Sequence, residues 1–485
     1  MKNTEGVRLH SAYNPDREAE RYVESVLLDK SPRIIVVTEP AESYLANAFR
    51  KRLPHAHLIA LRYTNQNFID TDNLWDAVWR PNSIQSVGDF LFSSILEEFL
   101  PATIFVPWKP SDSQWPERSK KVWDEIASFI TIQTAVIRTR AHFGKRWLAN
   151  SVYNSVFAQN IVILPQITKP ALLACAGPSL KSIFPLNTDS LYITAVSSAL
   201  SCLSFHGVKP DLCITTDGGY WSRDHFRYCS PDIPVAFPLE AAIPADILEN
   251  NPVAFFSYGS QLERSLYRLT GITPVLAQRN GTVAGTAASY LLDHGKNSII
   301  AAGLDLSVEQ SFTHVRPHAF DPLLETMIGR CFPLCGILYE RSGNGMALDA
   351  YARWFGSRDE KFSKRFFRVP ESTRIIPKIK SASLSKFLKN NRESIPTGPS
   401  CLQKQDISTV YARGQLVASF LEETADIIRT FHGDIEKNLL LLEIVQLVAF
   451  TGYISYLNSG TPGTWREETS EYLFSLAKKV RARVQ

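Results

Sequence analysis

The stretch Leu172–Leu180, with the sequence LLACAGPSL, decides the fold of this chain. Its apolar run has the composition of a strand and ends at Gly177, which lets the backbone approach a ligand closely. Pro178 is favoured at the first position of a helix. Ser179 and Leu180 follow, so a hydroxyl stands beside the unpaired N–H groups of a helix start, where a phosphate binds well. The stretch is either a phosphate-binding turn or an ordinary connection between a strand and a helix.

Apolar segments of strand length recur along the chain after this turn, and helical patterns separate several of them. The predicted strands are 171–175, 191–196, 211–216, 234–237, 253–258, 274–278 and 298–302. Uniformly apolar strands joined by helices predict a mostly parallel sheet covered on both faces, which is a Rossmann-like α/β domain. Ligands bind outside the carboxyl ends of the strands in such sheets. Small and polar residues collect at these predicted ends, namely Gly177, Ser179, Ser197, Ser198, Asp217 and Asp305.

Asp217 ends the strand 211–216 and is followed by Gly218 and Gly219. A carboxylate in this place binds ribose hydroxyls, a metal or an amine, or it caps the next turn. The sequence alone leaves both interpretations open.

The segment 279–287 predicts a helix start at the same edge of the sheet. Arg279, Asn280, Gly281 and Thr282 precede a helix whose alanines and leucines fall on one face. A helix start is a second favourable position for an anion. Close packing of the helix on the sheet would explain the small residues equally well.

The last motif follows the strand 298–302, where Gly303 and Asp305 send a carboxylate toward the same edge. His314 and His318 lie on the loop that follows, and histidine acts as a base near neutral pH without a large pKa shift. We therefore expect His314 to be a general base, with His318 as the second candidate. A solvated loop histidine is the alternative.

Composition limits the class of protein. The chain has 485 residues, a net charge of +4 and a mean hydropathy of −0.10, which are ordinary for a globular protein and predict no nucleic-acid partner. Its seven scattered cysteines predict reduced thiols, and for Cys331 and Cys335 we expect buried thiols and no metal. No secretory signal and no membrane span are expected, because the apolar run 439–450 is too short to cross a bilayer. These features predict a cytoplasmic protein.

Three domains are expected from the pattern. Residues 1–165 predict a small accessory α/β domain, with strands at 33–37, 57–61 and 103–107. Residues 166–340 hold the Rossmann-like domain with all four motifs, and residues 341–485 predict a mostly helical domain with apolar stripes at helical spacing.

The four motifs, taken in order, resemble the central domain of the motility-associated factor (Maf) glycosyltransferases, also called 6-hydroxymethylpterin diphosphokinase MptE-like. The matching positions are Gly177–Leu180, Pro210–Asp217, Gly281–Ala287, Gly303–Leu306 and Thr313–His314. The same order is similar, more distantly, to bacterial sialyltransferases that use CMP-sialic acid.

This resemblance implies transfer of a nonulosonic acid, of the pseudaminic or legionaminic type, from a CMP-activated donor to Ser or Thr of flagellin. It implies catalytic roles for His314, Asp217 and Asp305, and no required cofactor. The residues expected to hold the nucleotide sugar are Gly177, Pro178, Ser179, Leu180, Ser197, Ser198, Gly218, Arg279, Asn280, Gly281, Thr282, Gly303 and His318.

Two other functions remain compatible with the sequence. One is diphosphate transfer from ATP to a pterin, in which Asp217 and Asp305 would hold Mg²⁺. The other is a non-catalytic protein that binds a nucleotide sugar and escorts flagellin. The sequence predicts no oligomeric state.

Overall fold

The computed structural model describes residues 8–27, 32–307, 314–336, 345–371, 374–391, 401–431, 433, 435–459 and 463–485. The chain divides into two compact units. The first comprises Met1–His142 and Ala449–Glu468, and the second comprises Phe143–Val448 and Thr469–Gln485. Both domain boundaries expected from the sequence, 165/166 and 340/341, lie inside the second unit.

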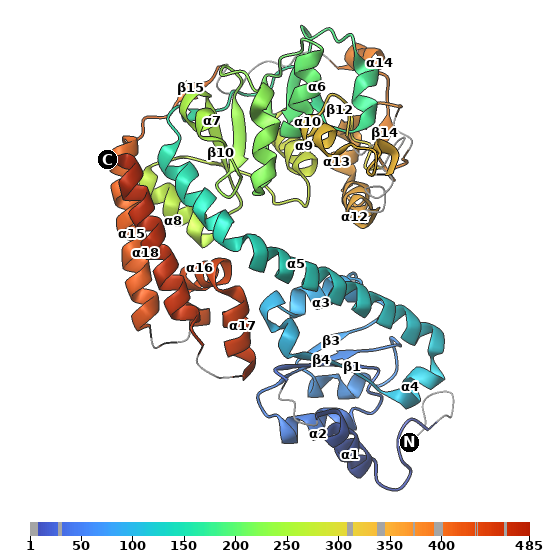
Figure 1. Cartoon of the computed structure of the whole chain (residues 1–485). Helices are drawn as coiled ribbons and strands as arrows, with labels where there is room; N and C mark the ends of the chain where they lie inside the picture. The colour runs from blue at the N-terminus through green and yellow to red at the C-terminus, as the bar shows by residue number, and fades with distance from the viewer. Residues whose placement is uncertain are drawn as a thin grey trace. The chain divides into compact units, whose positions relative to one another are not determined.

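The first unit is a small α/β domain with a four-stranded parallel sheet in the order β3-β2-β1-β4. Its strands are β1 (Ile34–Thr38), β2 (His57–Leu61), β3 (Ala77–Trp79) and β4 (Thr103–Pro107). Its helices are α1 (Pro15–Leu27), α2 (Tyr44–Arg52), α3 (Val87–Ser94), α4 (Lys109–Gln114), α17 (Phe450–Ser459) and the first part of α5 (Pro116–Phe157). The helices α1 and α2 pack together beside this sheet (Figure 1). All five residues of β1 are buried, because the central strand of a parallel sheet is covered on both faces.

The second unit is built on a nine-stranded sheet in the order β11-β10-β9-β8-β7-β6-β12-β13-β14, with every pair parallel. Its strands are β6 (Ala171–Ala174), β7 (Tyr192–Val196), β8 (Leu212–Ile214), β9 (Val235–Pro238), β10 (Val253–Ser257), β11 (Val275–Leu276), β12 (Ile299–Ala302), β13 (Phe366–Arg368) and β14 (Lys380–Ser381). The seven strands predicted in this region are all present, which confirms the Rossmann-like α/β fold. A separate antiparallel pair joins β5 (Val162–Ile163) to β15 (Gln403–Lys404).

The order of these strands creates a topological switch point at β6. From β6 the chain proceeds strand by strand to β11 at one end of the sheet, and then returns to place β12 on the other side of β6. Leu172 consequently pairs with Ile193 on one side and with Ile300 on the other. α/β proteins bind their ligands in a crevice at such a switch point, just outside the carboxyl ends of the strands.

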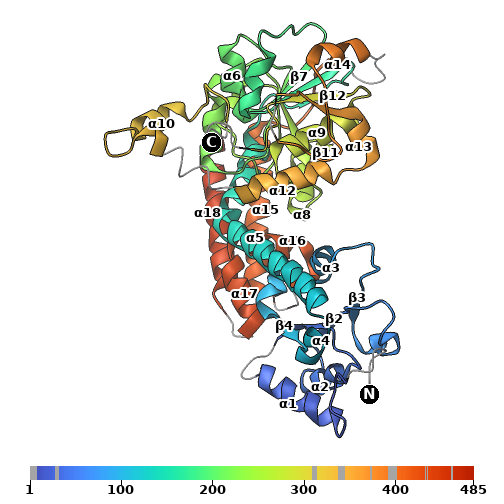
Figure 2. The ribbon, with the colours of Figure 1, turned by 90° about the vertical axis from the view of Figure 1, so that its right-hand side faces the viewer.

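Helices cover the sheet of the second unit. They include α6 (Leu200–Phe205), α7 (Ala245–Asn250), α8 (Gln261–Thr270), α9 (Val283–His294), α10 (Asp321–Met327), α12 (Gly345–Gly356), α13 (Glu360–Arg365) and α14 (Leu384–Asn390). The predicted apolar face of α9 is confirmed, since Ala287, Ala288 and Leu291 are buried and α9 packs against β6, β7 and β12. The helices α12 and α13 lie beside α9 (Figure 2), where Trp354 of α12 contacts Gly285.

The C-terminal helices α15 (Val410–Thr430), α16 (Leu439–Val448) and α18 (Trp465–Val484) confirm the predicted helical character of this region (Figure 1). The single residue Ala449 separates α16 from α17. In α16 Leu441, Ile444 and Val445 are buried. No single helix in the described ranges is long and apolar enough to span a membrane, although α16 and α17 pass by length and composition as a bent pair.

The thiols of all seven cysteines are free. Cys175, Cys202 and Cys213 are buried, but Cys331 and Cys335 are exposed, so the expectation of buried thiols at these two positions was wrong. They lie in the segment after α10, where the side chains are largely exposed and no apolar face covers them.

Candidate functional site

The carboxyl edge of the nine-stranded sheet gathers the residues predicted at the strand ends. Ser197 follows β7, and Gly303 with Asp305 follows β12 on the other side of β6. Glu240 after β9 and Tyr258 after β10 also lie at this edge and were not predicted from the sequence. Arg279 after β11 was predicted, but its contacts with these two residues were not. Polar or small groups therefore follow β7, β9, β10, β11 and β12 at this edge.

The turn after β6 is held by Asp305. One oxygen of the Asp305 carboxylate accepts from the backbone N–H of Ser179 at 2.8 Å, and the other accepts from the Ser179 hydroxyl at 2.5 Å. Asp305 is only 2% exposed. Its carboxylate therefore takes the position at the start of the short helix Pro178–Ile183 that the sequence assigned to a phosphate. Ser179 and Asp305 contact each other, and together they tie β12 to β6.

Two glycines make this arrangement possible. A Cβ on Gly177 would lie 2.4 Å from Asp305 Oδ2, and a Cβ on Gly303 would lie 2.2 Å from the carbonyl oxygen of Cys175. Gly303 also has a φ of 71°, which side chains rarely adopt. The neighbouring Pro178 and Leu180 are buried, as Ser179 is.

Three histidines meet at the switch point. The backbone N–H of Val315 donates to the carbonyl of Ala176 at 2.7 Å, which brings the loop after β12 back over the end of β6. The rings of His314 and His318 are 4.6 Å apart, and the rings of His318 and His225 are 5.4 Å apart. The predicted return of this loop is confirmed for the described residues, while Thr313 lies outside them.

His225 was missed by the sequence analysis. It lies in the 3-10 segment Tyr220–Tyr228 after β8, and its Nδ1 is 3.4 Å from the hydroxyl of Ser197. The Ser197 hydroxyl in turn bonds to that of Thr215 at 3.2 Å, and Ser198 beside it is half-buried. The pairing of β7 with β8 places these groups together, and no spacing within the sequence signals it.

The protein holds these imidazoles neutral. Burial, followed by repulsion from neighbouring imidazoles, lowers the pKa of His318 to about 3 and that of His225 to about 4. Desolvation also lowers the pKa of His314, which keeps an exposed surface. Burial disfavours the charged form of a base, so all three are uncharged at pH 7.

Two of the ring nitrogens have no hydrogen-bond partner among the residues that the structure describes. The Phe320 backbone N–H donates to His318 Nδ1 at 3.3 Å, so in the neutral ring the proton resides on Nε2. The Nε2 atoms of His318 and His225 are buried, and among the described residues neither has a hydrogen-bond partner. A buried polar atom without a partner is costly, and such atoms at the ligand edge indicate a ligand that would satisfy them.

Asp217 and Gly281 meet Tyr351 at the same edge. Asp217 is exposed, and its Oδ1 accepts from the Gly219 backbone at 2.7 Å, which is the turn-capping role left open by the sequence. Burial, and to a smaller extent the negative charge of Asp217, raise the pKa of Tyr351, which lies on α12. The Tyr351 ring lies 3.3 Å from the position of a Cβ on Gly281. Gly218, by contrast, is buried against Trp147. A Cβ added at Gly218 would lie 2.4 Å from the Trp147 ring.

Arg279 is an exposed cation at this edge. It forms an ion pair with Glu240 at 2.7 Å and lies 4.7 Å from the centre of the Tyr258 ring, yet its side chain remains 54% exposed. The adjacent Thr282 hydroxyl caps α9 by accepting from Gly285 at 3.3 Å, and Asn280 donates to the Gln278 carbonyl at 3.2 Å. Thr282 and Asn280 thus shape the turn, and Arg279 is available to an anion.

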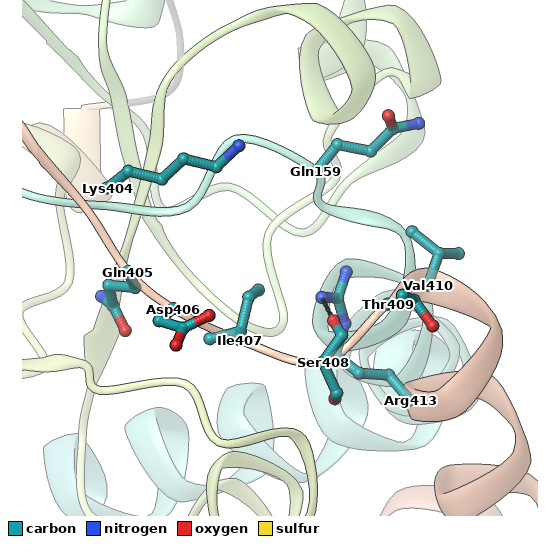
Figure 3. Close-up of a pocket in the computed structure, with 9 residues that line it drawn as sticks. All are labelled: Gln159, Lys404, Gln405, Asp406, Ile407, Ser408, Thr409, Val410 and Arg413. Carbon is teal, nitrogen blue, oxygen red and sulfur yellow. Dashed lines mark hydrogen bonds between the residues drawn. The ribbon is translucent and has the colours of Figure 1, made fainter.

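No group of three His, Cys, Asp or Glu residues that could hold a metal is found within the described ranges. A cavity of about 530 Å³ lies elsewhere in this unit, at the amino ends of β10 and β11 (Figure 3). There Gln405 bonds to both backbone groups of Thr273, and the buried Arg413 donates to the carbonyls of Val156 and Ala158 at the end of α5. This cavity is on the opposite edge of the sheet from the histidines.

The fold defines a Rossmann-like α/β protein, and the switch point of its sheet carries the candidate site. Residues 145–311 match the protein family described as 6-hydroxymethylpterin diphosphokinase MptE-like. An uncharacterized protein of Treponema pallidum (strain Nichols) is 35% identical over 325 residues, which cover 65% of this chain and 72% of that protein. The chain belongs to the MptE-like family, as its four motifs predicted.

A solved structure titled MAf glycosyltransferase, from Magnetospirillum magneticum AMB-1, is also similar. The TM-score is 0.48 at 11% sequence identity, and the match covers 98% of this chain and 84% of that chain. A likeness at this level does not bear on the activity of this chain.

Proposed function

We propose that this protein is a glycosyltransferase that moves a nonulosonic, sialic-acid-like sugar from a CMP-activated donor to Ser or Thr hydroxyls of flagellin. The observation that carries the proposal is the pair of buried Nε2 atoms of His225 and His318 beside the switch point, neither of which has a hydrogen-bond partner within the described part of the chain. The resemblance of the motifs to the Maf domain, given by the sequence, supports the choice of donor and acceptor.

In this proposal the donor lies along the carboxyl edge, with its phosphate near the histidines and its nucleoside extending toward Arg279. The bond between the sugar's anomeric carbon and the phosphate oxygen breaks, and CMP leaves with the electron pair. N–H donors that are fixed in place stabilise such a developing charge without reorganisation. The protonated Nε2 of His318 is such a donor at this edge.

The acceptor hydroxyl forms the new glycosidic bond and must lose its proton as it does so. We assign His314 to this step, because it is the exposed member of the histidine cluster and its pKa is lowered, so it is neutral and able to accept a proton at pH 7. Asp305 is a positioning residue here, since both of its oxygens hold Ser179. Asp217 retains one carboxylate oxygen for a donor hydroxyl. The proposal requires no cofactor and places the protein in the cytoplasm.

A thermal-shift titration tests the proposal. CMP should raise the melting temperature of the wild type, because a ligand that binds only the folded state stabilises it. The shift should shrink in Arg279→Ala and persist in Arg227→Ala, an exposed arginine beyond His225 that serves as the matched control.

Stabilisation by ATP with Mg²⁺ and a pterin, without a response to CMP, would replace the proposal with diphosphate transfer. A response to CMP without modification of purified flagellin by the CMP-activated sugar would leave a binding protein and refute the transferase.

A further inference from the structure

The first unit has a cavity of its own at the carboxyl ends of β2 and β3. It measures about 530 Å³, and its walls are the loop Arg62–Asn67 after β2, the end of β3 at Trp79, and the beginning of α5. Because this sheet is parallel, its carboxyl edge is the place where a ligand is expected. No role in the proposed glycosyl transfer involves this unit.

The buried Arg62 and the half-buried Arg80 fix the loop that forms the cavity. Arg62 is 0% exposed and bonds to Glu39 at 3.2 Å and to Asp72 at 3.0 Å. Arg80 bonds to Asp72 at 2.7 Å and donates to the carbonyls of Thr64 at 2.8 Å and Asn67 at 3.1 Å. A buried ion pair contributes little net stability, because desolvation offsets the attraction. Its effect here is to hold the backbone of the loop in one shape.

The wall of the cavity that α5 forms carries two cationic side chains. Arg118 and Lys121 of α5 are exposed on its wall. Arg118 donates to the carbonyl of Tyr63 at 3.3 Å, and Lys121 has no ion pair within the described part of the chain. Not one of the residues that line this cavity is Asp or Glu. Two cations without an opposing carboxylate favour an anionic ligand.

The remaining walls favour a sugar. The amide side chains of Asn65 and Gln66 are exposed beside the cations and provide donors and acceptors that hydroxyl groups can use. Trp79 and Trp115 supply flat apolar surface, and the Trp79 Nε1 is already satisfied by the Gln85 carbonyl at 2.9 Å. Small-molecule sites combine such aromatic surface with a few fixed polar groups.

We propose that this cavity binds a small anionic sugar, with the ligand's phosphate or carboxylate on Arg118 and Lys121 and its ring beside Trp79. This site is separate from the histidine cluster and does not depend on the proposed transferase activity.

Isothermal titration of the whole protein tests the proposal with three probes: glucose 6-phosphate, glucuronate and glucose. At least one anionic sugar should bind, and neutral glucose should bind at least tenfold more weakly, because a charge-assisted contact is lost; tenfold corresponds to about 1.4 kcal/mol. The anionic probe that binds identifies the phosphate or the carboxylate as the group recognised.

Variants locate the binding. Arg118→Ala and Lys121→Ala should each weaken the binding of the anionic sugar at least tenfold. Lys120→Ala is the matched control, since Lys120 is adjacent on α5 and pairs with Asp124 at 2.8 Å away from the cavity residues. Arg279→Ala, at the edge of the second unit, should also leave this binding unchanged.

The proposal is overturned if neither anionic sugar binds, if glucose binds as well as they do, or if Arg118→Ala and Lys121→Ala retain full affinity. Loss of binding in Arg279→Ala alone would assign the sugar to the second unit and would equally refute the site.

Discussion

Replacing Asp305 by Ala is expected to destabilise the second unit strongly. The substitution removes two hydrogen bonds, at 2.8 and 2.5 Å, from a carboxylate that is 2% exposed, and it leaves the N–H and the hydroxyl of Ser179 buried without that acceptor. A hydrogen bond to a charged group contributes about 1.5–3 kcal/mol. We therefore expect a loss of about 3 kcal/mol or more in the free energy of unfolding.

Urea unfolding, followed by tryptophan fluorescence, measures this loss against a matched control. Asp217→Ala removes a carboxylate at the same edge that is exposed and accepts one backbone bond at 2.7 Å, so its cost should stay below about 1 kcal/mol. Asp305→Asn should fall between the two, because an amide oxygen can still accept one bond. Equal costs for the Asp305→Ala and Asp217→Ala variants would refute the reasoning that Asp305 holds the turn.

Three further predictions concern the site. His314→Ala should lower turnover by about a hundredfold or more with little change in donor affinity. The acidic limb that this variant removes from the pH–rate profile should lie below pH 6.5, because the pKa of His314 is lowered. Full turnover in the variant contradicts the role of His314 as general base. The free energy of unfolding should fall as the pH decreases from about 6.5 to about 4, because His225 and His318 bind protons in the unfolded chain but not in the folded protein. Urea unfolding of a His225→Gln, His318→Gln double variant should show a weaker dependence of this free energy on pH. An unchanged dependence contradicts the conclusion that both imidazoles are neutral in the folded protein. Gly177→Ala should lower both stability and CMP affinity, because its Cβ would overlap the Asp305 carboxylate. Gly329→Ala is the control, since no atom lies within 4 Å of the added Cβ, and it should leave CMP affinity intact; calorimetry of both variants decides the point.

The parts of the fold that the sequence predicted are those set by local composition. The strand at 171–174 is a fully buried apolar run, and the burial of Ala287 and Leu291 follows helical spacing. By contrast, β13 and β14 have three and two residues, and β13 ends in the charged Arg368. Strands this short and this polar give no periodic signal, so the sheet is wider than predicted.

The composition of the site was predicted better than its contacts. Ser179 and Asp305 were both placed at the ligand edge, but their contact with each other depends on β6 and β12 being neighbours, and the two residues are 126 positions apart. His225 was missed for the same reason, since its position beside His318 depends on tertiary structure. Both contacts depend on the order in which the strands pair, and this order cannot be derived from the local patterns of a single sequence.

The placement of β12 beside β6 also determines when the crevice can form during synthesis. The strands β6 to β11 pair with sequence neighbours, so each can add to the sheet soon after it emerges. β12 must instead return to the first strand of the series, and contacts of such long sequence separation form slowly. A nascent chain that stops before Ile299 exposes one apolar edge of β6 to other strands. The edge of β6 is therefore covered only after β12 has been synthesised. A chaperone that binds the growing chain would have this exposed edge of β6 as its binding site.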